Sequence, residues 1–185
     1  DAGGSEQFWP HGVNWARETA RMLSNYGIEW FEEPLPPDDI DGYAELTRSS
    51  PVPIASGEVL TRRQAFLPWI TRRAVDIIQP DTTKNGGLTE SRRIAMWAYD
   101  HNVQMVSHGW NTAVGLAADL QLAAAIPVAR YVEYLTPCAY IEDLLEKPFE
   151  LDENGYLEIP AEPGLGRALC PDRVARYTAS QRIFR

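Results

Sequence analysis

The stretch Val-Asp-Ile-Ile-Gln-Pro-Asp, residues 75–81, decides the fold. Val75–Gln79 is mostly β-branched and apolar, which predicts a strand that is buried on both faces. Pro80 ends the run, and Asp81 follows it directly. Strands covered on both faces are typical of parallel sheets flanked by helices. The stretch therefore predicts a β/α fold with a carboxylate at the carboxyl edge of its sheet.

The same pattern returns on both sides of this stretch at nearly constant spacing. Short apolar runs end on a polar residue in WFEEP, PIASGE, VQMVSHG and RYVEY, and the intervals between these residues are 23 to 27. One strand, one helix and two turns of a (β/α) barrel need about that length. The polar residues that end the runs are Glu32, Glu58, Asp81, His108 and Glu133.

The number of units indicates an incomplete barrel. Five strands can be counted, and Asp1 would end another, whereas a closed barrel has about eight. We therefore expect residues 1–135 to form the C-terminal part of a TIM-type (β/α) barrel. Residues 136–185 change character, with the turn signal Asn154-Gly155 between short β-prone pieces, and predict an arm that packs on another surface.

Local signals place individual elements. Helical spacing predicts a helix over Val13–Tyr26, stopped by Gly27, and Ile28–Phe31 predicts a strand after it. The sequence Thr61-Arg-Arg-Gln64 resembles a capping box, so a helix is expected to start there and to run through Ile70.

Composition excludes some classes of partner. The 185 residues carry a net charge of −9 with dispersed Lys and Arg, which argues against nucleic acid and against an anionic membrane surface. No apolar run approaches the ~18 residues of a transmembrane helix. The two cysteines, Cys138 and Cys170, lie far apart and indicate free thiols rather than a disulfide, which favours a cytoplasmic origin.

Three acids at expected strand ends, Asp1, Glu32 and Glu58, suggest a metal site. Neighbouring parallel strands lie about 4.8 Å apart, so these carboxylates can converge. Bare carboxylates so close would repel one another unless a cation neutralised them, and a hard divalent ion such as Mg²⁺ suits oxygen ligands. The alternative is a set of solvated loop acids. Glu33 is expected to point to the opposite face of its strand.

Asp81 and His108 end successive strands, so the carboxylate can reach the imidazole and raise its basicity. The chain has no G-x-S-x-G nucleophile elbow, which favours a base acting on carbon over an acyl-enzyme. Lys84 is either a second acid/base group or a simple loop lysine. Other residues in reach of the same rim are expected to bind substrate, namely His11, Trp110, Asn111 and Glu133.

Taken together, these motifs resemble the enolase superfamily, and within it the mandelate racemase/muconate lactonizing enzyme group, closest to the acid-sugar dehydratases. The resemblance rests on WFEEP at Trp30–Pro34, SGE at Ser56–Glu58, PDxxKxGG at Pro80–Gly87, SH at Ser107–His108 and the Glu of YVEY at Glu133. It implies Mg²⁺ on Asp1, Glu32 and Glu58, a catalytic dyad of Asp81 and His108, and a substrate contact from Glu133. It also implies an N-terminal capping domain, on which the arm would pack, and an upstream Lys motif.

The implied reaction removes the proton α to a carboxylate through an ene-diolate, for which this superfamily is itself the standard example. We expect dehydration of a sugar acid, because the loops near the site are rich in hydrogen-bonding groups. The alternatives are a racemase or epimerase of the same superfamily, a metal-dependent aldolase or hydrolase, and a non-catalytic barrel fragment. A homo-oligomer is expected from the exposed sheet edges, and the 185 residues alone are expected to be inactive.

Overall fold

The computed structural model describes residues 1–3 and 12–182, and its centre is a five-stranded parallel sheet. The strands pair in chain order, each parallel to the next. They are β1 (Phe31–Glu32), β2 (Ile54–Ser56), β3 (Ile77–Ile78), β4 (Gln104–Ser107) and β5 (Ala129–Val132). The expected partial barrel is confirmed, because pairing in chain order brings the successive strand ends to one rim.

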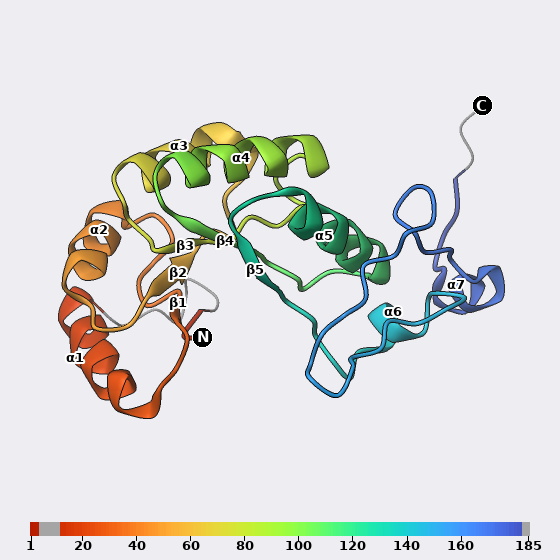
Figure 1. The fold of residues 1–185 in the computed structure, drawn as a ribbon, viewed down its shortest axis with the longest axis horizontal. Coiled ribbons are helices and arrows are strands. Elements are labelled where there is room, and N and C mark those ends of the chain that lie inside the picture. The colour runs from red at the N-terminus through yellow and green to blue at the C-terminus, as the bar shows by residue number, and fades with distance from the viewer. Residues whose placement is uncertain (4–11, 183–185) are drawn as a thin grey trace.

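Helices cover the outside of the curved sheet in chain order (Figure 1). Side chains such as Tyr43, Ile78 and Ile94 are fully buried between the two layers. On the inner face of the sheet, Ala55 and Val106 form a smaller buried cluster. The central strands β2 and β3 are thus buried on both faces, as Val75–Gln79 predicts, whereas Arg130 and Tyr131 of the last strand, β5, are exposed. The helices are α1 (Val13–Leu23), α2 (Ile40–Ser49), α3 (Arg62–Thr71), α4 (Leu88–Asp100) and α5 (Ala113–Ala125).

The helix expected before Gly27 and the strand expected after it both form, but with different bounds. The helix before Gly27 forms as α1 followed by the 3₁₀ turn η2 (Ser24–Tyr26), and Gly27 ends it with φ of 64°. The strand expected over Ile28–Phe31 is displaced to β1, because pairing with β2 begins at Phe31. The backbone of Ala2 donates to the carbonyl of Glu32 at 2.9 Å, so the first residues lie against the free edge of β1.

The helix expected from Thr61 through Ile70 is confirmed as α3, but the capping box expected at its start does not form. Thr61 does occupy the N-cap of α3, but its side chain makes no capping hydrogen bond. Arg62 has a φ of 58°, outside the helical region, and its N–H donates to the carbonyl of Asn85 at 3.2 Å. A contact from the loop after β3 therefore replaces the local cap.

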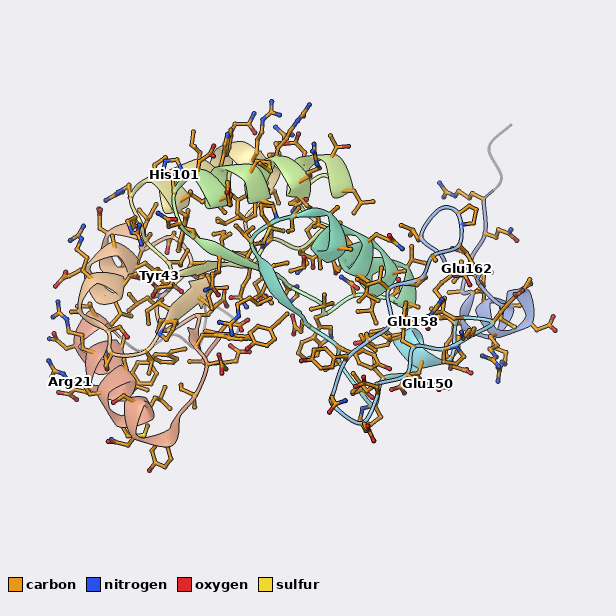
Figure 2. All side chains as sticks on the ribbon, in the orientation of Figure 1. Arg21, Tyr43, His101, Glu150, Glu158 and Glu162 are labelled. Carbon is orange, nitrogen blue, oxygen red and sulfur yellow. The ribbon has the colours of Figure 1, made fainter. Side chains whose placement is uncertain are left out.

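The chain after β5 packs on the end of the sheet assembly (Figure 1). It contains the short helices α6 (Ala139–Glu142) and α7 (Pro171–Tyr177). Ile141, Leu145 and Phe149 are buried against apolar side chains of α5. Figure 2 shows Glu150, Glu158 and Glu162 on this arm, whereas Tyr43 lies inside the layered part. In the ranges 1–3 and 12–182, no helix combines the length and the apolar character needed to cross a membrane.

Candidate active site

A cavity of about 400 Å³ opens at the carboxyl ends of the strands. Its walls come from the loops that follow β1, β2, β3, β4 and β5, together with the first residues of the chain. The cavity is therefore the meeting point that the strand-end pattern predicts. The residues that line it are Asp1, Gly3, Glu32, Glu33, Glu58, Lys84, His108, Trp110, Glu133 and Leu135.

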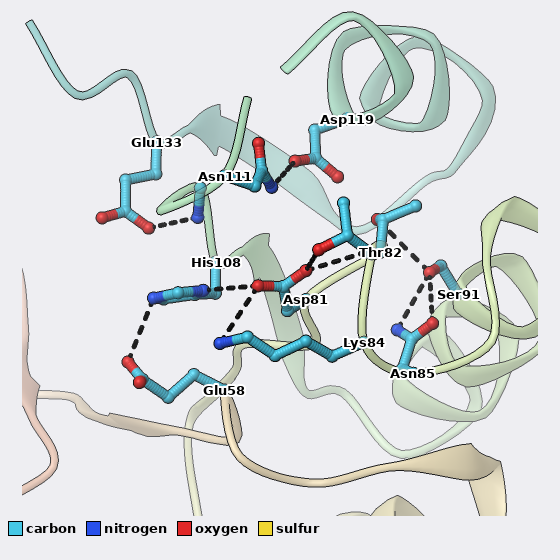
Figure 3. Close-up of polar contacts among 12 residues, drawn as sticks. Glu58, Asp81, Thr82, Lys84, Asn85, Ser91, His108, Asn111, Asp119 and Glu133 are labelled. Atoms are coloured by element: carbon cyan, nitrogen blue, oxygen red, sulfur yellow. Dashed lines mark hydrogen bonds and ion pairs between the residues drawn. The ribbon is translucent and has the colours of Figure 1, made fainter. Parts of the chain in front are cut away.

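His108 and Asp81 form a buried pair below this cavity (Figure 3). The Nδ1 atom of His108 lies 2.9 Å from Oδ2 of Asp81, and its Nε2 lies 3.3 Å from Oε2 of Glu58. The other oxygen of Asp81 accepts from the backbone N–H and the hydroxyl of Thr83 at 2.8 and 2.6 Å. Because both Asp81 oxygens are held, the carboxylate fixes the ring with its Nε2 toward the cavity.

The surroundings favour the charged form of both partners. Burial alone raises the pKa of Asp81, but hydrogen bonds from His108 and Thr83 and the charge of Lys84 bring the pKa well below its ordinary value. Burial lowers the pKa of His108, whereas the hydrogen bond to Asp81 and the charges of Glu58 and Glu133 outweigh it and raise the pKa above 6.5. A raised pKa strengthens the imidazole as a base.

The acids that line the cavity include one that the sequence analysis assigned to the wrong face. Glu33 is 5% exposed and faces the same cavity as Glu32 and Glu58. Side-chain alternation fails here because β1 ends at Glu32 and Glu33 has a φ of 45°. Burial, and then the negative charges of Glu58 and Glu32, raise the pKa of Glu33 from 4.5 to about 7.

The carboxylate oxygens that line this cavity suit a hard cation, but the side chains do not converge closely enough to form a complete metal site. Oε1 of Glu33 is buried and accepts no hydrogen bond from any described residue, and the charges of Glu58 and Glu32 disfavour the charged form of Glu33. A divalent cation would relieve both costs. Yet within residues 1–3 and 12–182 no three His, Cys, Asp or Glu side chains converge to hold an ion. Oε2 of Glu32 instead accepts from Trp30 Nε1 at 3.0 Å. The ligand set Asp1, Glu32 and Glu58 thus stays a prediction.

The remaining candidates are only partly brought together. Lys84 reaches Asp81 with Nζ at 3.2 Å from Oδ2, and Glu133 accepts from the backbone N–H of Gly109 at 2.5 Å. Trp110 lines the cavity but is 64% exposed. The side chain of Asn111 points to α5 instead of the cavity (Figure 3). The expected contact from His11 lies outside the described residues.

Comparisons with known proteins identify the family of this chain. Residues 6–173 match the family described as enolase C-terminal domain-like. The chain belongs to this family. It is 37% identical over 163 residues to the D-xylonate dehydratase of Haloferax volcanii, and it is 36% identical over 163 residues to the D-galactarolactone cycloisomerase of Agrobacterium fabrum. These matches cover 88% and 83% of this chain but only 39% and 43% of the relatives.

A solved structure shows the same relation in three dimensions. The mandelate racemase/muconate lactonizing enzyme from Sulfitobacter superposes with a TM-score of 0.82 at 31% sequence identity. The match covers 91% of this chain and 43% of that one. This enolase-family chain therefore spans less than half the length of the relatives it matches, and the resemblance to the mandelate racemase group is confirmed.

Asp119 is a polar residue of this enolase-family chain that the sequence analysis missed. It is the one acid in the Ala- and Leu-rich helix α5, and it is 1% exposed. Burial raises the pKa of Asp119 from 3.8 to about 6, against the lowering effect of hydrogen bonds from the side chains of Thr82 and Asn111. A lone charged residue in an apolar helix is rarely buried without a reason, so this signal was readable from the sequence.

Replacing Asp119 with asparagine is expected to stabilise the protein in a pH-dependent way. The folded-state pKa of about 6 lies above the ordinary 3.8, so the acid's contribution to stability is fully present below pH 3.8 and is lost as pH rises through 6. Asparagine has no such loss. The stability gain of Asp119→Asn should therefore grow between about pH 4 and pH 6, by up to roughly 3 kcal/mol. Urea unfolding across that range measures it, and a gain that does not change with pH would contradict the expectation.

Proposed function

We propose that this chain carries the base and the metal-binding acids of an active site that removes the proton α to a carboxylate, most simply in the dehydration of a sugar acid. The observation that carries the proposal is the buried pair of Asp81 and His108, whose other ring nitrogen, Nε2, faces a cavity lined by carboxylates and lies 3.3 Å from Glu58. The D-xylonate dehydratase among its relatives supports the reaction class.

His108 is the proposed base. With the Nδ1 proton donated to Asp81, the neutral ring carries its lone pair on Nε2, on the cavity side. Nε2 takes the α-proton from the substrate, and the charged imidazolium is then stabilised by Asp81 and by the nearby Glu58. In a dehydration the C–O bond at the β-carbon breaks next, and the imidazolium returns its proton to the departing hydroxyl, which leaves as water.

Asp1, Glu32 and Glu58 would hold Mg²⁺, and Glu33 stands beside them as a further candidate. Bound there, the ion supplies electrostatic stabilisation for the negative charge that develops on the substrate carboxylate. Lys84 also lines the cavity, and its ammonium group lies next to Asp81, where it can attract the substrate anion or exchange a proton.

Glu133 and Trp110 are the proposed substrate contacts. Glu133 is held by the backbone N–H of Gly109, and an added Cβ on Gly109 would lie 2.5 Å from the Glu133 carbonyl oxygen. The backbone after His108 thus packs too closely on Glu133 for any side chain at position 109. This close approach keeps one wall of the cavity at a set distance from the base.

A racemase, epimerase or cycloisomerase would use the same first step. The cycloisomerase relative favours this second candidate, and Lys84 gives the cavity a second group able to exchange protons. The outcomes differ in where the proton returns and in which bond breaks. A non-catalytic barrel fragment would show no such step.

The test uses the full-length protein that contains this chain, supplied with Mg²⁺ and a panel of sugar acids including D-xylonate, in D₂O. Proton NMR follows loss of the α-proton, and a carbonyl assay follows dehydration. We expect α-proton exchange with at least one acid, and we expect EDTA to abolish it. Exchange without a dehydrated product would favour the racemase, epimerase or cycloisomerase reading. A folded, Mg²⁺-loaded protein that exchanges no α-proton would overturn the proposal.

A further inference from the structure

The buried carboxylate of Asp119 lies on α5, next to Asn111 and near the loops that carry Asp81 and His108 (Figure 3). Its helix, α5, packs against β5 and supplies no other acid. The Oδ2 atom of Asp119 lies 3.5 Å from Nδ2 of Asn111, and Oδ1 accepts no hydrogen bond from any described residue. A buried carboxylate with so few hydrogen bonds destabilises the folded state. Its presence is therefore not explained by stability.

The groups that face Asp119 flank the two members of the dyad. Thr82 directly follows Asp81, and Ser107 directly precedes His108. Both hydroxyls favour the charged form of Asp119, as does the amide of Asn111, whose Nδ2 lies 3.5 Å from Oδ2 of Asp119. Asp119 therefore contacts the loop after β4 through Asn111 and interacts electrostatically with Thr82 of the loop after β3.

The loop after β3 is itself anchored to helix α4 by side-chain hydrogen bonds. The Thr82 hydroxyl lies 3.3 Å from Oγ of Ser91, which hydrogen-bonds with the side chain of Asn85 at 3.0 and 3.1 Å. All three of these side chains are buried. A Thr82 hydroxyl that accepts from Ser91 keeps its own proton, with which it favours the charged form of Asp119.

We propose that Asp119 is a positioning residue of the dyad, which ties the loop bearing Asp81 to the loop bearing His108. The inference rests on the proposed function, because it takes this pair to be the reacting one. Only one hydrogen bond of 2.9 Å joins His108 to Asp81, and it depends on two loops from different strands. A carboxylate that contacts Asn111 of one loop and attracts the Thr82 hydroxyl of the other restrains their separation, which an apolar side chain at position 119 cannot do.

The electrostatics argue against a purely structural role. The negative charge of Asp81 raises the pKa of Asp119, so the two acids repel each other. If position 119 served stability alone, a neutral side chain would suit it better than an acid that is repelled by Asp81. Residues that cost stability while supporting the geometry of a site are the ones for which stability and activity trade against each other.

The test compares Asp119→Ala, which removes the acceptor, with Asp119→Asn, which keeps an amide oxygen, in the full-length protein. Misplacing a catalytic group by about 1 Å can cost about 10²-fold in rate. We expect Asp119→Ala to lower kcat by about that factor with KM changed less than about threefold, and Asp119→Asn to recover most of kcat. Equal kcat for Asp119→Ala and the unaltered protein would overturn the proposal.

The chain offers a matched control at the opposite end of the sheet. Asp76 is a half-buried acid whose pKa is also raised by burial, and its Oδ2 accepts from the backbone N–H of Ile54 at 2.9 Å. We expect Asp76→Asn to lower stability and leave kcat unchanged. If it lowered kcat as much as Asp119→Ala does, general destabilisation would explain both effects and the positioning role would be refuted.

A second readout does not depend on turnover. Nitrogen-15 NMR of labelled histidine, without substrate, reports which ring nitrogen of His108 carries the proton and how fast that proton exchanges with water. We expect Asp119→Ala to speed exchange of the Nδ1 proton, and Thr82→Val to do so to a smaller extent. Native His108 signals in Asp119→Ala would overturn the proposal even if the unaltered protein proved inactive on every sugar acid, which would count against the proposed function alone.

Discussion

Replacing His108 with asparagine is expected to lower the rate of α-proton exchange by about 10³-fold or more while leaving Mg²⁺ affinity nearly intact. The reason is that Nε2 of His108 is the ring nitrogen on the cavity side, whereas Nδ1 is engaged by Asp81. An asparagine amide can still donate to Asp81, so the buried carboxylate keeps a partner. Exchange in D₂O followed by NMR and calorimetric titration with Mg²⁺ measure the two effects.

His101 provides the matched control for that substitution. It lies at the end of α4, where its Nδ1 is 2.9 Å from the carbonyl of Trp97 (Figure 2). His101→Asn should therefore retain full activity. Near-native exchange in His108→Asn would rule out His108 as the base and shift attention to Lys84, the other proton-exchanging group next to Asp81.

The order and pairing of the strands were predictable because they follow from spacing. A right-handed crossover places consecutive parallel strands side by side, so a regular βα interval predicts β1 to β5 in chain order. The bounds of the strands were less predictable. Ile28–Phe31 has the composition of a strand, yet pairing starts only at Phe31, since the partner strand β2 sets where hydrogen bonds begin.

Long-range contacts explain the local expectations that failed. The pattern at Thr61–Gln64 has the residues of a capping box, but the N–H of Arg62 bonds to Asn85, which is distant in the sequence. Glu33 was assigned to the wrong face by strand alternation, which ceases to apply one residue after β1 ends. No local pattern carries either piece of information.

The candidate site divides in the same way. Acids and the histidine at strand ends were found because the fold brings all strand ends to one rim. Asn111 was expected at the cavity because it follows His108 closely, but its side chain turns to Asp119. Loop residues have no fixed periodicity, so proximity in sequence does not decide which way they point.

Replacing Asp81 with asparagine is expected to lower turnover by about 10⁴-fold, as the corresponding change does in a Ser-His-Asp triad. The amide oxygen of the new side chain can keep both bonds from Thr83, which leaves the NH₂ group facing His108 and Lys84. That group donates to Nδ1, so the ring proton moves to Nε2 and the nitrogen on the cavity side can no longer accept the α-proton.

Two measurements test this argument at its separate steps. Nitrogen-15 NMR of His108 should show a protonated Nε2 and a bare Nδ1 in Asp81→Asn, the reverse of the unaltered protein. Asp100→Asn, at an exposed acid that ends α4, should change neither the ring signals nor the rate. If Asp81→Asn kept more than about a tenth of the activity, the tautomer of His108 could not be what makes it a base, because the substitution preserves the shape of the site, reverses the hydrogen bond to His108 and removes the ion pair with Lys84.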